Sequence, residues 1–200
     1  MGLLTGKKAF ITGAEQGIGK ESAKKLIEAG CDIYIHYFSG EEGPRELIAL
    51  AEQQGCRAAC GFADLTDEED AARCVAQAAE FLGGIDILVN NVGGIIARKW
   101  LGEIEPHFWR TVIDVNMTTM LNVTQQALPW LKAAPDGASI VNLASLAGRS
   151  GGHAGSLVYS TTKGAVLTWT RSLAAELGEH GIRVNAVAPG LILGTRFHDQ

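Results

Sequence analysis

Short apolar runs rich in β-forming residues alternate with longer helical stretches from one end of the chain to the other. The run Ile85–Val89 is almost continuously apolar, as expected for a strand covered on both faces. Strands of this kind, each followed by a helix, favour βαβ units and a parallel sheet. The expected strands are Lys7–Ile11, Asp32–Tyr37, Arg57–Phe62, Ile85–Asn90, Ser139–Leu143 and Arg183–Val187, and the expected helices are Gly17–Ala29, Gly43–Gln54, Thr66–Leu82, Pro106–Leu131 and Tyr159–Gly178.

Local signals mark several of the expected helix ends. Gly30 follows the first helix as a stop, Pro106 suits the first turn of the fourth, and Thr66–Glu69 has the pattern of a capping box. The glycine-rich stretch 148–155 is short enough to be a loop. Without an internal repeat or a linker, the sequence predicts one domain over residues 1–200.

The composition is that of an ordinary soluble globular protein, with 46% hydrophobic and 20% charged residues. The net charge of -5 comes from 17 basic and 22 acidic residues without a basic block, which argues against binding to nucleic acid or to an anionic membrane. The apolar runs are too short to cross a bilayer, and the first residues lack a signal-peptide apolar region. We therefore expect a cytoplasmic protein with a small-molecule partner.

The cysteines and histidines do not have the spacing of a metal site. The chain has no C-x-x-C pair, and its five histidines are scattered. His36 and His153 are expected in ordinary loop or strand-end roles, although either could touch a ligand. We expect no metal, and reduced structural thiols with disulfides as the alternative at Cys31, Cys56, Cys60 and Cys74.

A glycine-rich turn joins the first strand to the first helix. The run Thr12–Gly19 reads TGAEQGIG, which is a G-x-x-x-G-x-G spacing and not the G-x-G-x-x-G fingerprint. Glycines let the backbone turn tightly and approach a pyrophosphate, whose charge is favoured by the N-terminus of a helix. A plain tight turn is the alternative, but ligands of open α/β sheets bind at this edge of the sheet.

The other strands also end in polar or glycine-rich residues. Asp64 follows the third strand, Asn90–Gly94 ends the fourth, Ser145 follows the fifth, and Pro189–Gly190 follows the sixth. Because parallel strands end at the same edge, one crevice could collect all of these residues.

Tyr159 and Lys163 are four residues apart on an expected helix, so their side chains share one face. A phenol has a pKa near ~10, and acid–base work at neutral pH needs roughly 4 kcal/mol of stabilisation of the anion. An ammonium about 4 Å away supplies roughly that much at an effective dielectric of about 20. An ordinary pair on a helix surface is the alternative reading of this spacing.

Together these motifs resemble the short-chain dehydrogenase/reductase family, and the resemblance runs from Leu4 to Thr195. It implies a Rossmann-type doubly wound parallel sheet with helices on both faces and a nicotinamide cofactor, NAD(P)H. The residues that carry it, in chain order, are the TGAEQGIG run, Asp64, the NNVG run at 90–93, Asn116, Ser145, the YSTTK run at 159–163 and the NAVAPG run at 185–190.

The resemblance implies a catalytic group of Asn116, Ser145, Tyr159 and Lys163. Tyr159 would pass a proton to or from the substrate oxygen, and Ser145 would hydrogen-bond that oxygen. Lys163 would lower the pKa of the tyrosine and bind the nicotinamide ribose, and Asn116 would hold a water that links Lys163 to solvent. Without the family, Asn116 reads as a core hydrogen-bonding residue and Ser145 as a loop or capping serine.

For the cofactor, the resemblance places the glycine run on the phosphates, Asp64 and Leu65 at the adenine, and Asn90 with Gly93 near the adenosine ribose. Asp64 could equally cap the helix that follows it. Pro189, Gly190, Ile192 and Thr195 would border the nicotinamide. The full set of expected cofactor-binding residues is Gly13, Gln16, Gly17, Ile18, Gly19, Tyr37, Phe38, Ser39, Asp64, Leu65, Asn91, Val92, Gly93, Tyr159, Lys163, Pro189, Gly190, Ile192 and Thr195.

Three features depart from the family pattern. Val92 stands where the family usually has alanine, and Thr195 lies one residue later than usual, so its contact with the carboxamide is less secure. The chain also stops at Gln200, whereas family members usually continue through a substrate-covering segment and a final strand. We therefore expect a missing C-terminal portion of the family fold.

The end of the second strand bears on the choice of cofactor. A carboxylate there accepts hydrogen bonds from the ribose 2′-hydroxyl, and a nearby arginine meets a 2′-phosphate. Tyr37 is not an acid, Phe38 is not a base, and Gln16 replaces the arginine that many NADP-preferring members carry. Lacking the repelling acid, the sequence leans slightly to NADP.

The expected function is reversible hydride transfer between nicotinamide and a secondary alcohol or ketone. A catalytically silent NAD(P)-binding regulatory protein of the same fold is the alternative. The loops Ile95–Trp100 and His153–Leu157 should line the substrate pocket, which suits a 3-oxoacyl thioester or a sugar or polyol. Arg98 and Lys99 could instead be solvated surface residues. The family also implies a homo-oligomer, either a dimer or a homotetramer.

Overall fold

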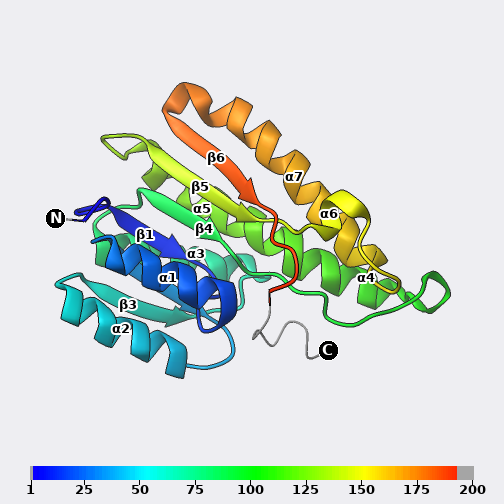
Figure 1. Cartoon of the computed structure of the whole chain (residues 1–200). Coiled ribbons are helices and arrows are strands. Elements are labelled where there is room, and N and C mark those ends of the chain that lie inside the picture. The colour runs from blue at the N-terminus through cyan, green and yellow to red at the C-terminus, as the bar shows by residue number, and fades with distance from the viewer. Residues whose placement is uncertain (1, 193–200) are drawn as a thin grey trace.

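Six parallel strands form one sheet in the order β3-β2-β1-β4-β5-β6 (Figure 1). The computed structural model describes residues 2–192. Every neighbouring pair of strands is parallel, as the alternation of apolar runs and helices predicts. The strands are β1 (Lys8–Ile11), β2 (Asp32–Tyr37), β3 (Ala58–Phe62), β4 (Ile87–Asn90), β5 (Ala138–Leu143) and β6 (Ile182–Val187).

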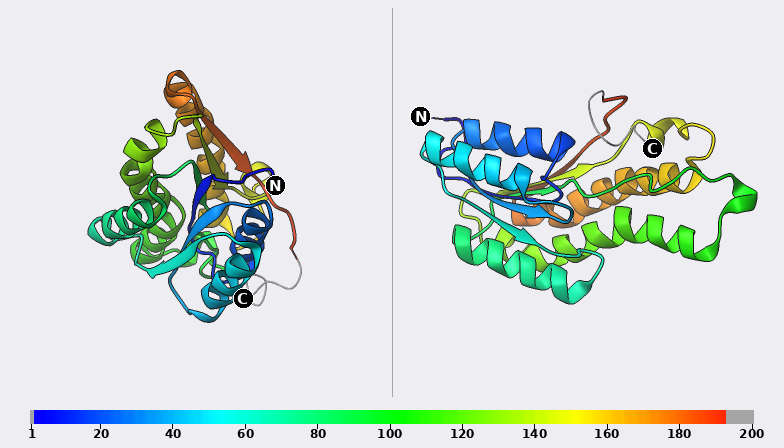
Figure 2. Two further views of the ribbon diagram at one scale, coloured as in Figure 1. Left: turned by 90° about the vertical axis from the view of Figure 1, so that its left-hand side faces the viewer. Right: turned by 90° about the horizontal axis from the view of Figure 1, so that it is seen from below.

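Helices cover both faces of this sheet. Figure 2 shows α1 and α2 on one side and α3, α5 and α7 on the other, so the expected Rossmann-type doubly wound fold is confirmed. The helices are α1 (Gly17–Glu28), α2 (Glu42–Gln54), α3 (Glu68–Leu82), α4 (Pro106–Ile113), α5 (Thr119–Lys132), α6 (Ala147–Ser150) and α7 (Leu157–Leu177), with short 3-10 turns at η1 (Leu101–Glu103) and η3 (Gly178–His180) and a π-helical segment η2 (Asp114–Thr118).

Two apolar clusters hold the layers together. Phe10, Leu88 and Ile140 pack toward α3, α5 and α7, and Ile11 and Ile33 pack toward α1 and α2. All five side chains are fully buried. Burial of a side chain of this size stabilises the fold by about 1.5–3 kcal/mol, so the sheet is a rigid support for the loops at its edges.

One local prediction was wrong. The cap of α3 is Asp67, whose side chain accepts from the backbone N–H of Asp70, and not Thr66, because the Thr66 hydroxyl instead donates to Asp64 at 2.7 Å. The helix expected over Pro106–Leu131 is helical throughout, and the π-helical segment η2 joins α4 to α5 within it. A π-helical turn changes the register of the helix and is frequent at functional sites.

The strand order reverses between β1 and β4, which lie side by side although β2 and β3 come between them in the sequence. The loops after these two strands are tied together there. Asn91 donates its backbone N–H to the Thr12 hydroxyl at 3.0 Å and its amide group to the Gly13 carbonyl at 2.7 Å. Ligands of doubly wound sheets bind at such a reversal.

Candidate active site

A cavity of about 620 Å³ lies at the carboxyl ends of the strands, and its size is that of a small-molecule site. We call the part around Gly13–Gly19, Phe38 and Asp64 the glycine-turn end, and the part around Ser145, Tyr159 and Lys163 the tyrosine end. The residues predicted to bind or act on ligands that line it are Gly13, Gln16, Gly17, Ile18, Gly19, Phe38, Asp64, Leu65, Asn91, Val92, Gly93, Ser145, Tyr159, Lys163, Pro189, Gly190 and Ile192.

The remaining predicted residues have other places. Tyr37 is buried and donates its hydroxyl to Glu41 at 2.6 Å. Asn90, expected near the adenosine ribose, does not line the cavity, and its side-chain amide donates to Thr124 and Asn142 in the core. Ser39 donates its hydroxyl to Glu15 at 3.1 Å. Thr195 lies outside the described residues.

The glycine turn has the geometry of an anion cradle. Gly13 and Gly17 have φ values of 62° and 56°, a conformation that glycine adopts without strain. A Cβ on Gly19 would lie 2.3 Å from the Gly13 carbonyl oxygen, so only glycine fits this close approach. No side chain caps the N-terminus of α1, which leaves first-turn N–H groups available for a pyrophosphate. The residues present therefore fit the phosphates of a dinucleotide.

The imidazole of His36 links the glycine turn to the end of β3. The Gly13 N–H donates to His36 Nδ1 at 3.1 Å, and Nε2 lies 3.0 Å from the Ala63 carbonyl. The imidazole is buried, and burial lowers its pKa despite the opposing effect of the Ala63 carbonyl. A neutral ring with its proton on Nε2 satisfies both contacts. The strand-end position predicted for His36 is thus confirmed, but the prediction did not include its hydrogen bond with Gly13 in the glycine turn.

Asp64 does not cap α3, because that cap is Asp67. Its carboxylate instead accepts from the N–H and the hydroxyl of Thr66 at 2.9 and 2.7 Å. The residue also lines the cavity. This local turn and a ligand contact are therefore compatible at Asp64.

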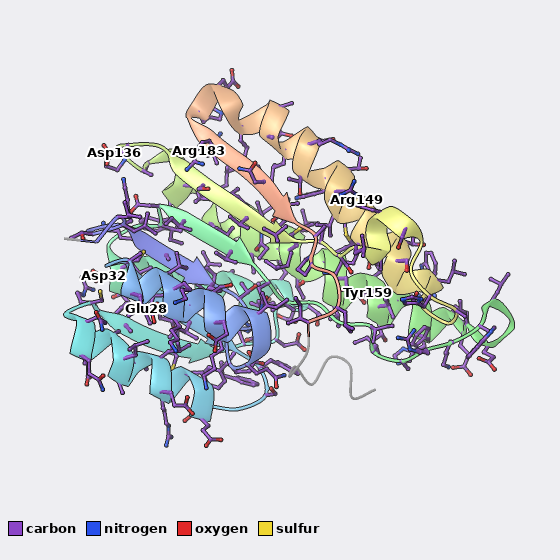
Figure 3. The ribbon with its side chains drawn as sticks, viewed as in Figure 1. Glu28, Asp32, Asp136, Arg149, Tyr159 and Arg183 are labelled. Atoms are coloured by element: carbon purple, nitrogen blue, oxygen red, sulfur yellow. The ribbon has the colours of Figure 1, made fainter. Side chains whose placement is uncertain are left out.

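At the tyrosine end, Tyr159 projects from the first turn of α7 (Figure 3) and is almost fully buried. Burial raises its pKa, and a hydrogen bond with Ser145 acts in the opposite direction. The backbone N–H of Ala147 donates to the Ser145 hydroxyl oxygen at 3.1 Å. The serine and the tyrosine thus meet as predicted, in a site where the phenol holds its proton at neutral pH.

Lys163 is also buried, and its Nζ donates to the Leu143 carbonyl at 2.7 Å. Burial lowers its pKa to about 8. Its ammonium lies 5.8 Å from the centre of the Tyr159 ring. In this structure burial has the largest effect on the pKa of Tyr159 and raises it, so the lowering of that pKa by Lys163 stays a prediction.

Asn116 lies within the π-helical segment and does not line the cavity. Its amide group donates to the carbonyls of Gly94 and Val112 at 2.8 and 2.9 Å, and its oxygen accepts from the Gly94 N–H at 3.1 Å. A Cβ on Gly93 would lie 2.7 Å from Lys163 Nζ and 2.8 Å from the Asn116 oxygen. Asn116 therefore fixes the loop after β4 directly beside Lys163.

The two loops predicted to line the substrate pocket meet, since the Lys99 N–H donates to the Gly155 carbonyl at 3.0 Å. Arg98 and Lys99 do not line the cavity. The Arg98 guanidinium lies 3.4 Å from the Ala154 carbonyl, and Lys99 pairs with Glu105 at 3.3 Å. The surface reading of these two cations is the one that the structure supports.

Ile96, which belongs to the loop predicted to line the substrate pocket, lines the cavity. It has a φ of 64°, the only positive φ among the described non-glycine residues, and such strain in a β-branched residue often marks a functional site. Sequence reasoning missed Glu15, which also lines the cavity and reaches from the glycine turn to the end of β2. Its signal in the sequence was its position as an acid within the glycine run.

Between residues 2 and 192, no helix has the length and hydrophobicity to span a bilayer, and no group of three metal-ligating side chains gathers. All four cysteines are free, and burial raises the pKa of Cys31 and Cys74 to about 12.

Comparisons with known proteins indicate one family. The sequence matches the family model described as short chain dehydrogenase over residues 7–200. The sequence is 36% identical over 191 residues to the uncharacterized oxidoreductase YhdF of Bacillus subtilis. This match covers 96% of the chain and 65% of the length of YhdF. The sequence is 34% identical to the 3-oxoacyl-[acyl-carrier-protein] reductase FabG of Staphylococcus aureus, over 94% of this chain and 75% of FabG.

A solved structure gives the same result. The crystal structure of the NADH-dependent reductase A1-R′ complexed with NAD has a TM-score of 0.90 at 31% identity, over 95% of this chain and 80% of that one.

Proposed function

Because the chain belongs to the short-chain dehydrogenase/reductase family, we propose that it is a nicotinamide-dependent oxidoreductase acting on a secondary alcohol or ketone. The observation that carries this proposal is one cavity with a glycine cradle at one end and the Ser145–Tyr159 pair at the other. The relative named as an NADH-dependent reductase and complexed with NAD supports it.

The chain's own residues would hold the cofactor along the whole cavity. The free N–H groups at the start of α1 would bind the pyrophosphate. Pro189, Gly190 and Ile192 would border the nicotinamide, and Lys163 would reach its ribose. When bound, the nicotinamide supplies or accepts the hydride.

Proton transfer would belong to Tyr159. Since burial keeps its phenol protonated at neutral pH, Tyr159 is ready to give a proton to a carbonyl oxygen during reduction. Ser145 would donate a hydrogen bond to that same oxygen and stabilise its developing charge. Lys163, with a pKa of about 8, is suited to return the proton, and Asn116 would hold the water that links it to solvent.

The substrate would enter beside Ile96 and Ile192, which line the cavity. These apolar side chains suit the chain of a 3-oxoacyl thioester, the substrate class named for FabG. A sugar or polyol is the second candidate, because the matched reductase A1-R′ is named as responsible for alginate metabolism. Oxidation of NADH or NADPH with each class, followed by absorbance, distinguishes them.

Replacement of Tyr159 tests the mechanism. Tyr159→Phe removes the transferable proton and keeps the ring, so turnover should fall by about 10³-fold or more, while the Kd of the reduced cofactor stays within about threefold. Tyr37→Phe is the matched control, because its hydroxyl contacts Glu41 and not the cavity. Turnover of Tyr159→Phe within tenfold of wild type would remove Tyr159 from the acid–base role.

A protein that binds the cofactor but turns over none of these substrates would support the alternative, a catalytically silent regulatory protein. Cofactor fluorescence on mixing measures the binding, and the turnover assay separates the two functions.

The proposal extends to assembly and location. Trp109 and Trp130 are 44% and 42% exposed, and exposed aromatic residues of this size are enriched in interfaces, which supports a homodimer or homotetramer. Sedimentation of the purified chain measures this, and a monomer at micromolar concentration would contradict it. The free thiols support a reducing, cytoplasmic location.

A further inference from the structure

Glu15 carries a carboxylate oxygen that no group within residues 2–192 satisfies. Its Oε1 accepts from the Ser39 hydroxyl at 3.1 Å, and the Phe38 N–H lies 3.4 Å away. Its Oε2 is buried and has no hydrogen-bond partner. A buried, unpaired acceptor destabilises a fold, more so when it is charged. Since Glu15 lines the cavity, the orphan oxygen is placed where a ligand can donate to it.

The surroundings favour a neutral donor over an anion. Asp64 lines the same end of the cavity, and Lys163 is the only Lys or Arg lining it among residues 2–192. Two basic side chains of α1 and α2 are already paired, Lys20 with Glu46 at 2.5 Å and Arg45 with Glu41 at 2.6 Å. A phosphate here would meet carboxylates without a free cation, whereas a hydroxyl would satisfy the orphan oxygen.

We propose that Glu15 accepts a hydrogen bond from the 2′-hydroxyl of the adenosine ribose and thereby selects NAD(H) over NADP(H). This rests on the proposed function, which places a nicotinamide dinucleotide in the cavity. A carboxylate at the end of the second strand ordinarily makes this selection. Here Tyr37 occupies the strand end, and the acid reaches the same place from the glycine turn, held by Phe38 and Ser39.

This reverses the slight preference for NADP expected from the sequence. That expectation rested on the lack of an acid at Tyr37 and took no account of side chains from other loops. The structure brings Glu15 to the strand end across 23 residues of sequence.

Direct titration of the purified protein with NADH and with NADPH, followed by nicotinamide fluorescence, tests the proposal without catalysis. The wild type should bind NADH at least about tenfold more tightly than NADPH. Glu15→Gln keeps the shape and removes the charge, so NADH should weaken and NADPH should tighten. The preference should fall by about tenfold or more.

Glu41→Gln is the matched control. Glu41 also carries its charge near the end of β2, but it contacts Tyr37 and Arg45 and does not line the cavity. Its loss should leave the preference within about twofold. If Glu15→Gln does not fold, Glu15→Asp provides the second variant, because it keeps the charge, and NADPH should remain the weaker ligand.

Tighter binding of NADPH than NADH by the wild type, or an unchanged preference in folded Glu15→Gln, would overturn the role of Glu15. Either result leaves the proposed function standing, because a dinucleotide still binds. Binding of neither nucleotide would overturn both.

Discussion

The two ends of the cavity hold their parts in different ways. At the glycine-turn end the backbone forms most of the site. Gly13 and Gly19 lie so close that a Cβ on Gly19 would be 2.3 Å from the Gly13 carbonyl oxygen. At the tyrosine end, buried polar side chains form most of the site. Lys163 donates a hydrogen bond to the Leu143 carbonyl, and Asn116 donates one to the Gly94 carbonyl. One end depends on the absence of side chains, and the other on their identity.

This difference has an energetic side. Backbone N–H groups at a helix start are unsatisfied in any helix, so exposing them to a ligand adds little cost. Burying an ammonium, in contrast, disfavours its charged form, as the lowered pKa of Lys163 records. Burial of Lys163 therefore lowers the stability of the fold at the tyrosine end, whereas the exposed N–H groups at the start of α1 lower it much less.

The sharpest test of this contrast is Lys163→Met. Because the variant removes a charged group beside Tyr159, turnover should fall by about 10³-fold. The free energy of unfolding should change little at neutral pH, since replacing a buried charge with an apolar group of similar volume is often neutral or stabilising. Activity assays and urea unfolding measure the two effects, with the exposed Lys132→Met as the control.

The pH dependence sharpens the same prediction. The pKa of Lys163 is about 8 in the fold and 10.5 when unperturbed, so between these values the unfolded chain binds the additional proton. The stability of the wild type relative to Lys163→Met should therefore rise as pH increases from 8 toward 10.5 and be lost again as pH falls through 8. If the free energy of unfolding of both proteins changes with pH in the same way, Lys163 does not have a lowered pKa in the fold.

At the glycine-turn end, the corresponding test adds an atom. A Cβ at Gly19 would lie 2.3 Å from the Gly13 carbonyl oxygen and 2.5 Å from the Asn91 amide nitrogen. Gly19→Ala must push the turn open, so cofactor affinity should fall by about 100-fold, or roughly 2.7 kcal/mol. Gly40→Ala is the control, because its Cβ meets no atom within 4 Å. Equal cofactor Kd values for the two variants would refute the close-approach argument.

The sequence predicted the fold well because its signals are local. Strands and helix ends are signalled by neighbouring residues only, as in the apolar run Ile85–Val89 and at the helix-end signals Gly30 and Pro106. All six expected strands are present. The meeting of Ser145 with Tyr159 also followed, since strand ends and helix starts of an α/β fold converge at one edge.

The missed features all depend on contacts between distant segments. The π-helical turn holds Asn116, which bonds to Gly94, 22 residues away, whereas the local sequence pattern is that of a plain helix. The direction of the Tyr159 pKa depends on how deeply the ring is buried, which spacing does not encode. Glu15 was passed over because the motif fixes the glycines and leaves the residues between them open.

The smallest expected effect lies beneath the glycine turn, at His36. Burial holds its pKa below the usual 6.5, although Glu15 and Asp64 oppose this. Above that pH the neutral ring accepts from the Gly13 N–H. As pH falls below 6.5, the unfolded chain takes up the proton first, so the stability that depends on His36 is lost. Protonation of the folded ring would also turn the acceptor into a second donor facing Gly13.

His36→Asn keeps an acceptor near Gly13 and removes the titration. At neutral pH its cofactor affinity should fall by about fivefold, or roughly 1 kcal/mol, through loss of the bond to Ala63. Between pH 6.5 and 5 the wild type should lose affinity and stability while the variant stays level, so the two curves converge. Fluorescence titration and urea unfolding across this range measure both quantities. If the curves stay parallel, His36 only fills space, and the glycine turn depends on its backbone alone.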